Sequence, residues 1–252
     1  MKNDLLVCHH FFEDPLKIPF KTHAHDKWEF LFIVKGNPIC MIEGRRYAVQ
    51  EGTLLVFKPA QIHRVHASGG HPYEYFSLMC DEAILSLQSI RRFSVSAGIL
   101  TFKKPKRIHR MFSEINAQCQ NISLDSSARV KLLTIEALMK SVEEELKNDS
   151  PVLLSEDAVV VAAVSFIESN LHRITRLNQI CDAVGVRKER LYDRFIHNML
   201  ISPMKYVRAK RTALAKADSS TVENRVAVLK KYGFKNEKLF DEEYMSFYRS
   251  VP

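Results

Sequence analysis

The chain has 252 residues, of which 46% are hydrophobic and 26% charged, and its formal net charge is +8 at pH 7. This length suffices for one large domain or two ordinary ones with buried cores. The composition excludes a disordered, collagen-like or disulfide-dense class. The five cysteines show no close pairing motif, so we expect reduced thiols in a cytoplasmic protein. No stretch approaches the roughly 20 apolar residues of a membrane span, and we expect neither a signal peptide nor a membrane partner.

Charged residues and histidines are unevenly distributed along the chain. Residues 1–88 carry 9 Lys and Arg against 10 Asp and Glu, whereas residues 155–252 carry 17 against 12. The basic excess is concentrated in residues 173–216, with 11 basic and 3 acidic side chains. Seven of the ten histidines lie in the first of these regions. Two regions of different chemistry predict two domains.

The region from Trp28 to Cys80 has the pattern of short β-strands. Runs rich in β-branched and aromatic residues, such as Trp28 to Val34 and Thr53 to Phe57, alternate with turns that contain glycine. Several short strands at close spacing are typical of a small antiparallel barrel or sandwich. We therefore expect such a barrel over residues 1–88.

Four residues that can bind a metal ion fall within this pattern: His23, His25, Glu29 and His63. Because residues i and i+2 of a strand face the same side, His23 and His25 can both point into the barrel, where Glu29 and His63 can complete a group. Three imidazoles and a carboxylate suit zinc, iron, nickel or manganese, so the pattern predicts a divalent metal site. The alternatives are a polar effector pocket without a metal, or histidines that only satisfy hydrogen bonds in the barrel wall.

These four residues, with Gly36 following Glu29, have an order and spacing that resemble the two-part motif of the cupin barrel. The resemblance implies a cupin-like fold in which the four matching residues hold a divalent metal in many members.

Residues 89–150 have the pattern of helices at 105–120 and 124–147. Apolar residues cover a broad face of the second helix, which predicts either the contact of a homodimer or packing against the chain's own barrel. We therefore expect residues 89–150 to form a helical linker and dimerisation region. The polar segment 148–151 ends in a helix-breaking proline, so we expect a domain boundary there.

Helical spacing continues at residues 158–171, 174–183 and 187–198, with Gly185 supplying a tight turn before the last of these. The last helix carries four basic side chains opposite its apolar face: Arg187, Lys188, Arg190 and Arg194. A helix, a tight turn and a basic helix are typical of the helix-turn-helix motif, although a solvated basic face has the same pattern.

A longer series of residues extends this pattern over some hundred positions: Phe166, Leu177, Ile180, Gly185, Leu191, Phe195, Ser202, Pro203, Tyr206, Arg211, Gly233, Phe234, Phe240, Tyr244 and Pro252. Their order and spacing resemble the DNA-binding domain of the arabinose-regulator (AraC-type) family of transcription factors. The resemblance implies a barrel that senses a small-molecule effector, followed by two helix-turn-helix motifs over residues 155–252 that are joined by a helix at 203–217. It also implies double-stranded DNA and RNA polymerase as partners. The expected fold class is α+β.

The two expected motifs differ in charge. The second recognition helix, expected at 235–247, carries Asp241, Glu242 and Glu243, and carboxylates beside phosphates weaken DNA binding. We therefore predict that the first motif and the joining helix make most of the DNA contacts, through Arg187, Lys188, Arg190, Arg194, Lys210 and Arg211.

The sequence thus predicts a sequence-specific transcription regulator that is not an enzyme and whose barrel responds to a small effector or a metal. A cupin metalloenzyme with an appended helical domain is an alternative, but it leaves the basic C-terminal half unexplained. A second alternative is a protein-interaction module derived from a regulator that has lost DNA binding. No Ser-His-Asp or Cys-His arrangement and no phosphate-binding glycine loop stands out in the sequence.

Overall fold

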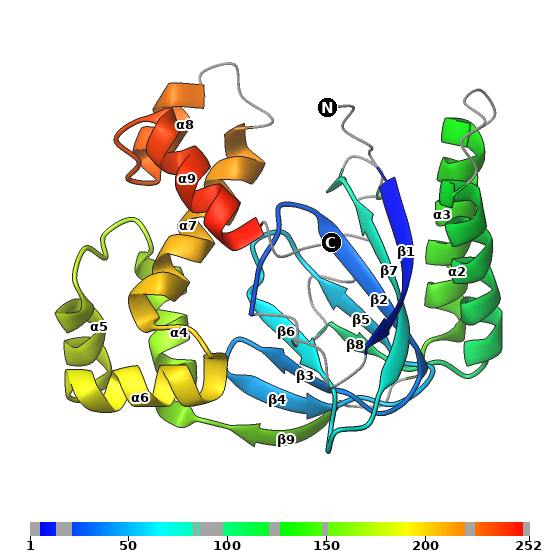
Figure 1. Cartoon of the computed structure of the whole chain (residues 1–252), viewed down its shortest axis with the longest axis horizontal. Coiled ribbons are helices and arrows are strands. Elements are labelled where there is room, and N and C mark those ends of the chain that lie inside the picture. The colour runs from blue at the N-terminus through cyan, green and yellow to red at the C-terminus, as the bar shows by residue number, and fades with distance from the viewer. Residues whose placement is uncertain are drawn as a thin grey trace.

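The structure is a computed structural model of the chain, and it describes residues 6–13, 22–82, 85, 98–120, 127–147, 151–219 and 225–248. Two antiparallel sheets form the N-terminal part, and the C-terminal part is all helical (Figure 1). The expected α+β class, with an antiparallel barrel ahead of an α-helical domain, is confirmed. Among the described residues, no helix combines the length and the apolarity needed to cross a bilayer.

A five-stranded sheet forms one wall of the barrel. Its strands, in spatial order, are β1 (Leu6–Glu13), β7 (Tyr73–Cys80), β2 (Trp28–Lys35), β5 (Leu54–Phe57) and β8 (Ile99–Leu100). In β2 the side chains of Leu31 and Ile33 belong to the core inside the barrel, while Phe30 and Phe32 belong to the core outside it. Because both faces of the sheet are covered, β2 is nearly continuously apolar instead of alternating with polar residues.

A four-stranded sheet forms the opposite wall. Its strands are β6 (His63–His66), β3 (Ile39–Ile42), β4 (Arg45–Ala48) and β9 (Val152–Glu156). The sequence pattern predicts neither β8 nor β9. β8 pairs with β5, some fifty residues earlier in the chain, and β9 pairs with β4, about a hundred residues earlier. β9 directly follows the expected domain boundary, so the connection between the two domains is itself a strand of the barrel.

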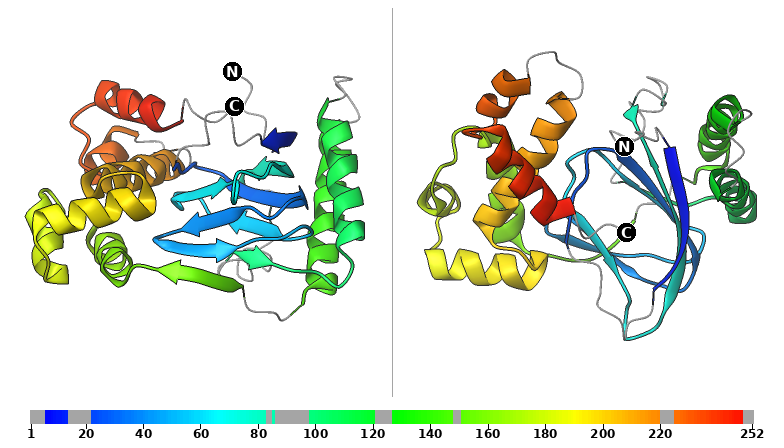
Figure 2. Two further views of the ribbon diagram at one scale, coloured as in Figure 1. Left: turned by 60° about the horizontal axis from the view of Figure 1, so that its bottom comes forward. Right: turned by 45° about the horizontal axis from the view of Figure 1, so that its top comes forward.

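Helices α2 (Pro105–Gln120) and α3 (Ser127–Glu145) cover the outer face of the five-stranded sheet (Figure 2). The ring of Phe112 stacks against Phe32 and Phe76 at centroid distances of 5.5 and 6.1 Å. Four described apolar side chains of α3 are buried in the same core: Ile135, Leu138, Met139 and Val142. They pack against the chain's own barrel, which is one of the two alternatives that the sequence leaves open.

Six helices follow on the other side of the barrel: α4 (Ala158–Asn170), α5 (Leu177–Val184), α6 (Lys188–Met199), α7 (Pro203–Ser219), α8 (Arg225–Lys231) and α9 (Glu237–Tyr248). Gly185, with φ of 68°, ends α5 in the left-handed conformation and starts the turn to α6. α5 begins three residues later than expected, and the side-chain Oε1 of Gln179 accepts the backbone N–H groups of Thr175 and Arg176 ahead of it. α7 is the expected joining helix.

The barrel and the first helices of the C-terminal part share one hydrophobic core. Ala24, Met41, Ala60 and Ile62 of the barrel pack with buried residues of α4, α5, α6 and α7. The β3–β4 hairpin reaches into this junction through a two-residue turn in which Glu43 and Gly44 both have positive φ, the conformation that favours glycine. The two domains are therefore packed against each other.

We expect Gly44→Ala to destabilise this junction beyond the cost of backbone strain. A Cβ atom at Gly44 would lie 2.8 Å from Cγ1 of the buried Val160, and the φ of +84° already disfavours alanine. Gly70→Ala is the matched control, because its φ of +78° is similar and nothing lies within 4 Å. Urea unfolding should show a loss of about 1 kcal/mol in the control, from strain alone, and a larger loss for Gly44→Ala. Equal losses would show that the contact with Val160 does not constrain the junction.

Candidate metal centre and nucleic-acid-binding surface

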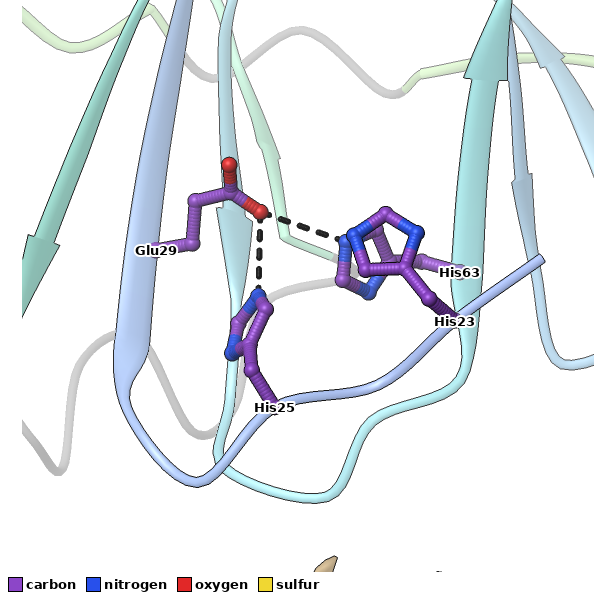
Figure 3. A group of neighbouring side chains, drawn as sticks. All are labelled: His23, His25, Glu29 and His63. Atoms are coloured by element: carbon purple, nitrogen blue, oxygen red, sulfur yellow. Dashed lines mark hydrogen bonds and ion pairs between the residues drawn. The ribbon is translucent and has the colours of Figure 1, made fainter. Parts of the chain in front are cut away.

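The structure brings His23, His25, Glu29 and His63 together between the two sheets (Figure 3). Each offers one ligand atom, and these atoms all lie within 4.8 Å of one another. His25, Glu29 and His63 are buried, and His23 is partly exposed. Glu29 comes from β2 and His63 begins β6. The segment of His23 and His25 runs antiparallel to β6, with a bridge between His23 and His63.

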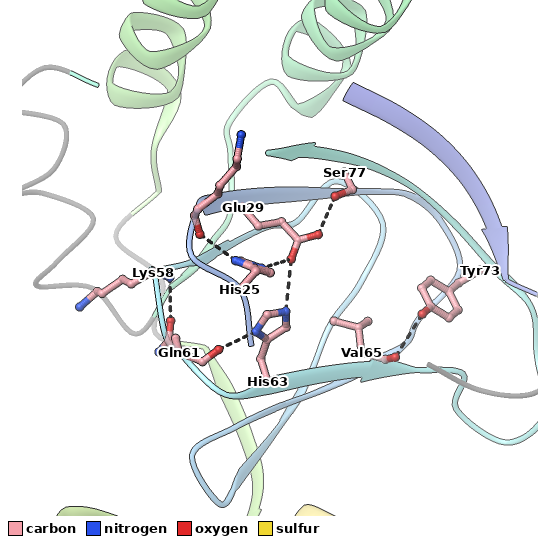
Figure 4. Close-up of polar contacts among 9 residues, drawn as sticks. His25, Glu29, Lys58, Gln61, His63, Val65, Tyr73 and Ser77 are labelled. Carbon is pink, nitrogen blue, oxygen red and sulfur yellow. Dashed lines mark hydrogen bonds and ion pairs between the residues drawn. The ribbon is translucent and has the colours of Figure 1, made fainter. Parts of the chain in front are cut away.

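The carboxylate of Glu29 is the centre of this group. Its Oε2 lies 3.0 Å from Nε2 of His25 and 3.2 Å from Nε2 of His63. Its Oε1 accepts a hydrogen bond of 2.5 Å from the Ser77 hydroxyl on β7 (Figure 4). Ser77 could not be predicted from the sequence, because no spacing relation links it to the histidines; the pairing of β7 with β2 brings it there. Ser77 leaves Oε2 as the oxygen that faces the rings.

Backbone carbonyls determine which nitrogen of two rings carries a proton. Nδ1 of His25 lies 2.7 Å from the Lys27 oxygen, and Nδ1 of His63 lies 2.9 Å from the Gln61 oxygen (Figure 4). A carbonyl can only accept, so both Nδ1 atoms donate, and each neutral ring turns the lone pair of Nε2 toward Glu29. Two lone pairs and a carboxylate oxygen repel one another unless a cation lies among them. That cation is either a ring proton or a metal ion.

The buried Nε2 of His63 fits the metal better than the proton. Among the described residues it has no hydrogen-bond partner of good geometry, although Oε2 of Glu29 is near. Burial lowers the pKa of His63, with Glu29 opposing the shift only in part, so the neutral ring is favoured. Burial alone would raise the pKa of Glu29, and the hydrogen bonds and positive charge that hold it well below its usual value come from His25 and His63. With neutral rings that turn lone pairs toward Oε2, a bound cation would have to supply that charge. Neutral imidazoles and an ionised carboxylate are the forms that bind a metal ion.

Three of the six basic residues predicted to contact DNA lie exposed at the N-terminal end of α6. Arg187 is the residue that precedes the helix, and Lys188 and Arg190 lie in its first turn. The apolar face of the helix, with Leu191 and Phe195, is fully buried in the shared core. The exposed end of α6 therefore carries three cationic side chains on one short stretch.

The other three predicted residues are engaged within the protein. Nη1 of Arg194 lies 2.6 Å from Oδ2 of Asp157, the residue that caps α4. Lys210 forms an ion pair with Glu168. The guanidinium of Arg211 donates to the backbone oxygens at the end of α4 and beyond it, those of Leu171 and Ile174. In this conformation these side chains hold α4, α6 and α7 together, and their contact with DNA stays a prediction.

The acidic residues of α9 are likewise partly used for internal contacts. Oδ1 of Asp241 lies 3.1 Å from Nη2 of Arg225 in α8. Glu243 is half-buried, and burial raises its pKa although Arg208 and Arg211 lower it. Glu242 is exposed. Two of the three carboxylates thus face other parts of the same domain.

Comparison with known proteins identifies the N-terminal domain. Residues 17–140 match the family model of the AraC-like ligand binding domain. The chain carries an AraC-like ligand binding domain. The match supports the resemblance to the AraC-type family for the N-terminal domain. No curated protein matches the chain in sequence.

Solved structures similar to the chain include ToxT from Vibrio cholerae O395, at 12% identity and a TM-score of 0.43 over 99% of this chain and 96% of that one. The AraC-like transcriptional activator CuxR is 14% identical, with a TM-score of 0.39 over 84% of this chain and 74% of that one. A double-stranded β-helix protein from Klebsiella pneumoniae covers 32% of this chain and 66% of its own, at 18% identity and a TM-score of 0.29. Similarities at this level transfer no ligand and no partner to the present chain.

We expect the contact between Asp157 and Arg194 to stabilise the C-terminal domain in a pH-dependent way. Burial raises the pKa of Asp157, but Arg194 and the capping N–H groups of α4 outweigh it and hold the pKa below its ordinary value of 3.8. A carboxyl whose pKa is lowered in the folded state contributes stability that is complete above its unfolded-state pKa. That contribution is lost as the pH falls through the folded-state pKa. Asp157→Asn should therefore cost about 1 kcal/mol or less at pH 7, as for a partly exposed ion pair, and a smaller part of that cost at pH 3.

Urea unfolding of the full chain at the two pH values measures this difference. Asp193→Asn, which removes an exposed carboxylate of α6, is the control for the loss of one negative charge. A cost for Asp157→Asn that stays the same at both pH values would contradict the ion pair.

Proposed function

We propose that the chain is a sequence-specific DNA-binding transcription regulator whose barrel binds a divalent metal ion, with α6 as its main DNA-recognition helix. The observation that carries the proposal is the exposed group of Arg187, Lys188 and Arg190 at the start of α6, in a chain with an AraC-like ligand binding domain. We assign residues 1–88, with strands β8 and β9, to the effector domain, 89–150 to a helical linker whose helices pack on that domain, and 155–252 to the DNA-binding domain.

The geometry and the charge of α5 and α6 favour DNA as the partner. α5 and α6, with the turn at Gly185, have the order and the tight connection of a helix-turn-helix. The N-terminal residues of a recognition helix are those that reach base edges in the major groove. There a guanidinium can pair with guanine, and a lysine can neutralise a phosphate. α7, with 17 residues, is about 26 Å long and separates this motif from the second one, formed by α8 and α9.

The proposal gives Arg194, Lys210 and Arg211 a positioning role. Each is committed to a partner within the helical domain, so phosphate contact would require it to exchange that partner. DNA recognition then depends chiefly on the first turn of α6. The partners that we propose are double-stranded DNA and, by resemblance to the AraC-type family, RNA polymerase, in the cytoplasm. A second copy of the chain, predicted from the broad apolar face of the second linker helix, stays a prediction, because buried apolar side chains of α3 pack against the chain's own barrel.

The set of converging side chains favours a metal ion. Three imidazoles and one carboxylate converge, and the carbonyls of Lys27 and Gln61 orient two of the rings. Ser77 orients the carboxylate. Such outer contacts accompany ligating histidines and carboxylates in metal sites, where they raise affinity. The donor set suits zinc, nickel, manganese or iron. The bound ion would supply positive charge among Nε2 of His25, Nε2 of His63 and Oε2 of Glu29.

We expect Lys188→Ala combined with Arg190→Ala to lower the affinity for the chain's own DNA site by at least about 10-fold at moderate salt. If both side chains contact phosphate, the dependence of log affinity on log salt concentration should become shallower by about 2. The site is obtained by immunoprecipitating the protein with its bound DNA and sequencing the fragments. Fluorescence anisotropy on such a fragment gives the affinity.

Two controls accompany this measurement. Lys103→Ala with Lys106→Ala removes the same charge from the barrel side of the molecule and should leave affinity nearly unchanged. Glu242→Ala, in α9, should not weaken binding, and a large loss there would show that the second motif reads DNA. Unchanged affinity of the α6 double variant would refute α6 as the recognition helix. Absence of any DNA binding would favour an interaction module instead.

We expect the purified chain to bind one divalent ion, tested separately with Zn²⁺, Ni²⁺ and Mn²⁺ by calorimetry and by elemental analysis. His63→Gln should abolish this binding or weaken it by at least about 100-fold, since it removes a ligand. Ser77→Ala should weaken it by roughly 10-fold, because only the orientation of Glu29 is disturbed. His71→Gln, an exposed histidine of the same domain, is the control. Equal affinity in all four proteins, or no binding to the wild type, would refute the metal site.

A further inference from the structure

Two short segments, residues 22–25 and 60–63, connect the metal-ligand cluster to α6. We propose that these segments couple the two binding sites, so that a metal ion bound in the barrel tightens DNA binding by α6. The inference rests on the proposed function, because it requires both a bound metal and bound DNA.

The segment 22–25 presents alternate side chains to opposite sides. His23 and His25 reach the ligand cluster inside the barrel. Thr22 is bonded to α6, and Ala24 lies in the core that the barrel shares with α4 to α7. This is the period of two of extended chain, in which neighbouring side chains point in opposite directions. Because stiff planar peptide units join these residues, a ring that shifts toward a metal displaces its neighbours at the domain junction.

The segment 60–63 has the same two-sided arrangement. His63 belongs to the ligand cluster, while Ala60 and Ile62 are fully buried in the shared core. Backbone hydrogen bonds join the two segments: the N–H of His23 donates to the oxygen of His63 at 3.1 Å, and the reverse bond is 3.0 Å. The N–H of Ala60 donates to the oxygen of His25 at 2.7 Å. Three of the four ligands therefore lie on one bonded unit.

The segment 22–25 and the neighbouring strand β4 both hold the C-terminal end of α6. The Thr22 hydroxyl donates a buried hydrogen bond of 2.6 Å to the backbone oxygen of Met199, the last residue of the helix. The guanidinium of Arg46, from β4, donates to the oxygen of His197 at 3.0 Å. The last carbonyls of a helix have no partner within it, so two barrel side chains supply partners for the end of α6.

The opposite end of α6 carries the residues proposed to contact DNA. The helix has 12 residues and is about 18 Å long, so a constraint at Met199 also restricts where Arg187, Lys188 and Arg190 lie. These three side chains are exposed in the docked arrangement, which is therefore open to DNA. A metal ion that orders residues 22–25 stabilises this arrangement and favours DNA binding. Linkage then requires DNA to tighten metal binding by the same factor.

The experiment measures both affinities on the full chain. DNA affinity is determined by anisotropy on the recovered fragment, with and without saturating Zn²⁺, or with Ni²⁺ or Mn²⁺ if that ion binds more tightly. Affinity for the same ion is determined with and without saturating DNA. We expect the metal to tighten DNA binding by about 5-fold or more, and DNA to tighten metal binding by an equal factor.

Thr22→Val tests the route of the coupling, because valine keeps the shape of threonine and lacks the hydroxyl. Both factors should fall toward 1 in this variant. Thr53→Val is the matched control, since Thr53 is a buried threonine of the barrel outside the shared core, and it should keep the wild-type coupling. Thermal unfolding checks that both variants are folded. If Thr22→Val does not fold, Arg46→Met, which removes the other barrel contact to the end of α6, should reduce the coupling factors instead.

The outcomes separate this inference from the proposed function. If the wild type binds both ligands and each affinity is independent of the other ligand, the coupling is refuted while the proposed function stands. A metal that weakens DNA binding also refutes it, as does a folded Thr22→Val protein with undiminished coupling. If the wild type binds no metal or no DNA, the proposed function fails and the coupling falls with it.

Discussion

Strand β2 and the segments 22–25 and 60–63 have a buried partner on both of their sides, and most features of the molecule depend on that constraint. In β2, alternate side chains face the barrel interior and the helices α2 and α3. On the opposite wall, the segments 22–25 and 60–63 face the ligand cluster on one side and the helical domain on the other. Because an extended chain reverses the direction of its side chains at each residue, a ligand and a domain contact can be neighbours in sequence. The barrel is therefore at once a binding site and a surface to which the helical domain is docked.

Much of this arrangement could be predicted from the sequence, because it depends on local patterns. The strand pattern between Trp28 and Cys80 and the helical spacing after Pro105 identify the correct classes of element. The i, i+2 relation of His23 and His25 correctly places both rings on one side, and the cupin-like motif adds Glu29 and His63 to the same cluster. These predictions are correct because each depends on the side-chain periodicity of one strand or helix, or on a motif whose spacing reflects the pairing of two strands.

What could not be predicted depends on pairing between distant segments. β9 joins the barrel through β4, about a hundred residues earlier in the chain, and its exposed apolar side chains follow no alternating pattern. Ser77 meets Glu29 because β7 pairs with β2, and Thr22 meets Met199 because two domains dock. A serine or a threonine in a strand has no signal in the sequence that separates such a contact from an ordinary position. The residues that orient the ligands and join the domains are therefore found only in the structure.

The number of charged residues in a stretch of the sequence differs from the number that the folded molecule exposes to solvent. The basic stretch 173–216 contains both the exposed first turn of α6 and side chains with internal partners, among them Arg194, Lys210 and Arg211. The acidic run of α9 is divided in the same way, since Asp241 and Glu243 face basic residues of their own domain. A charge that is already paired gains less from a phosphate than a solvated one, because its existing contact must first be broken. The exposed basic surface is therefore smaller than the net charge suggests, and part of it is the end of α6 that lies farthest from the barrel contacts of Thr22 and Arg46.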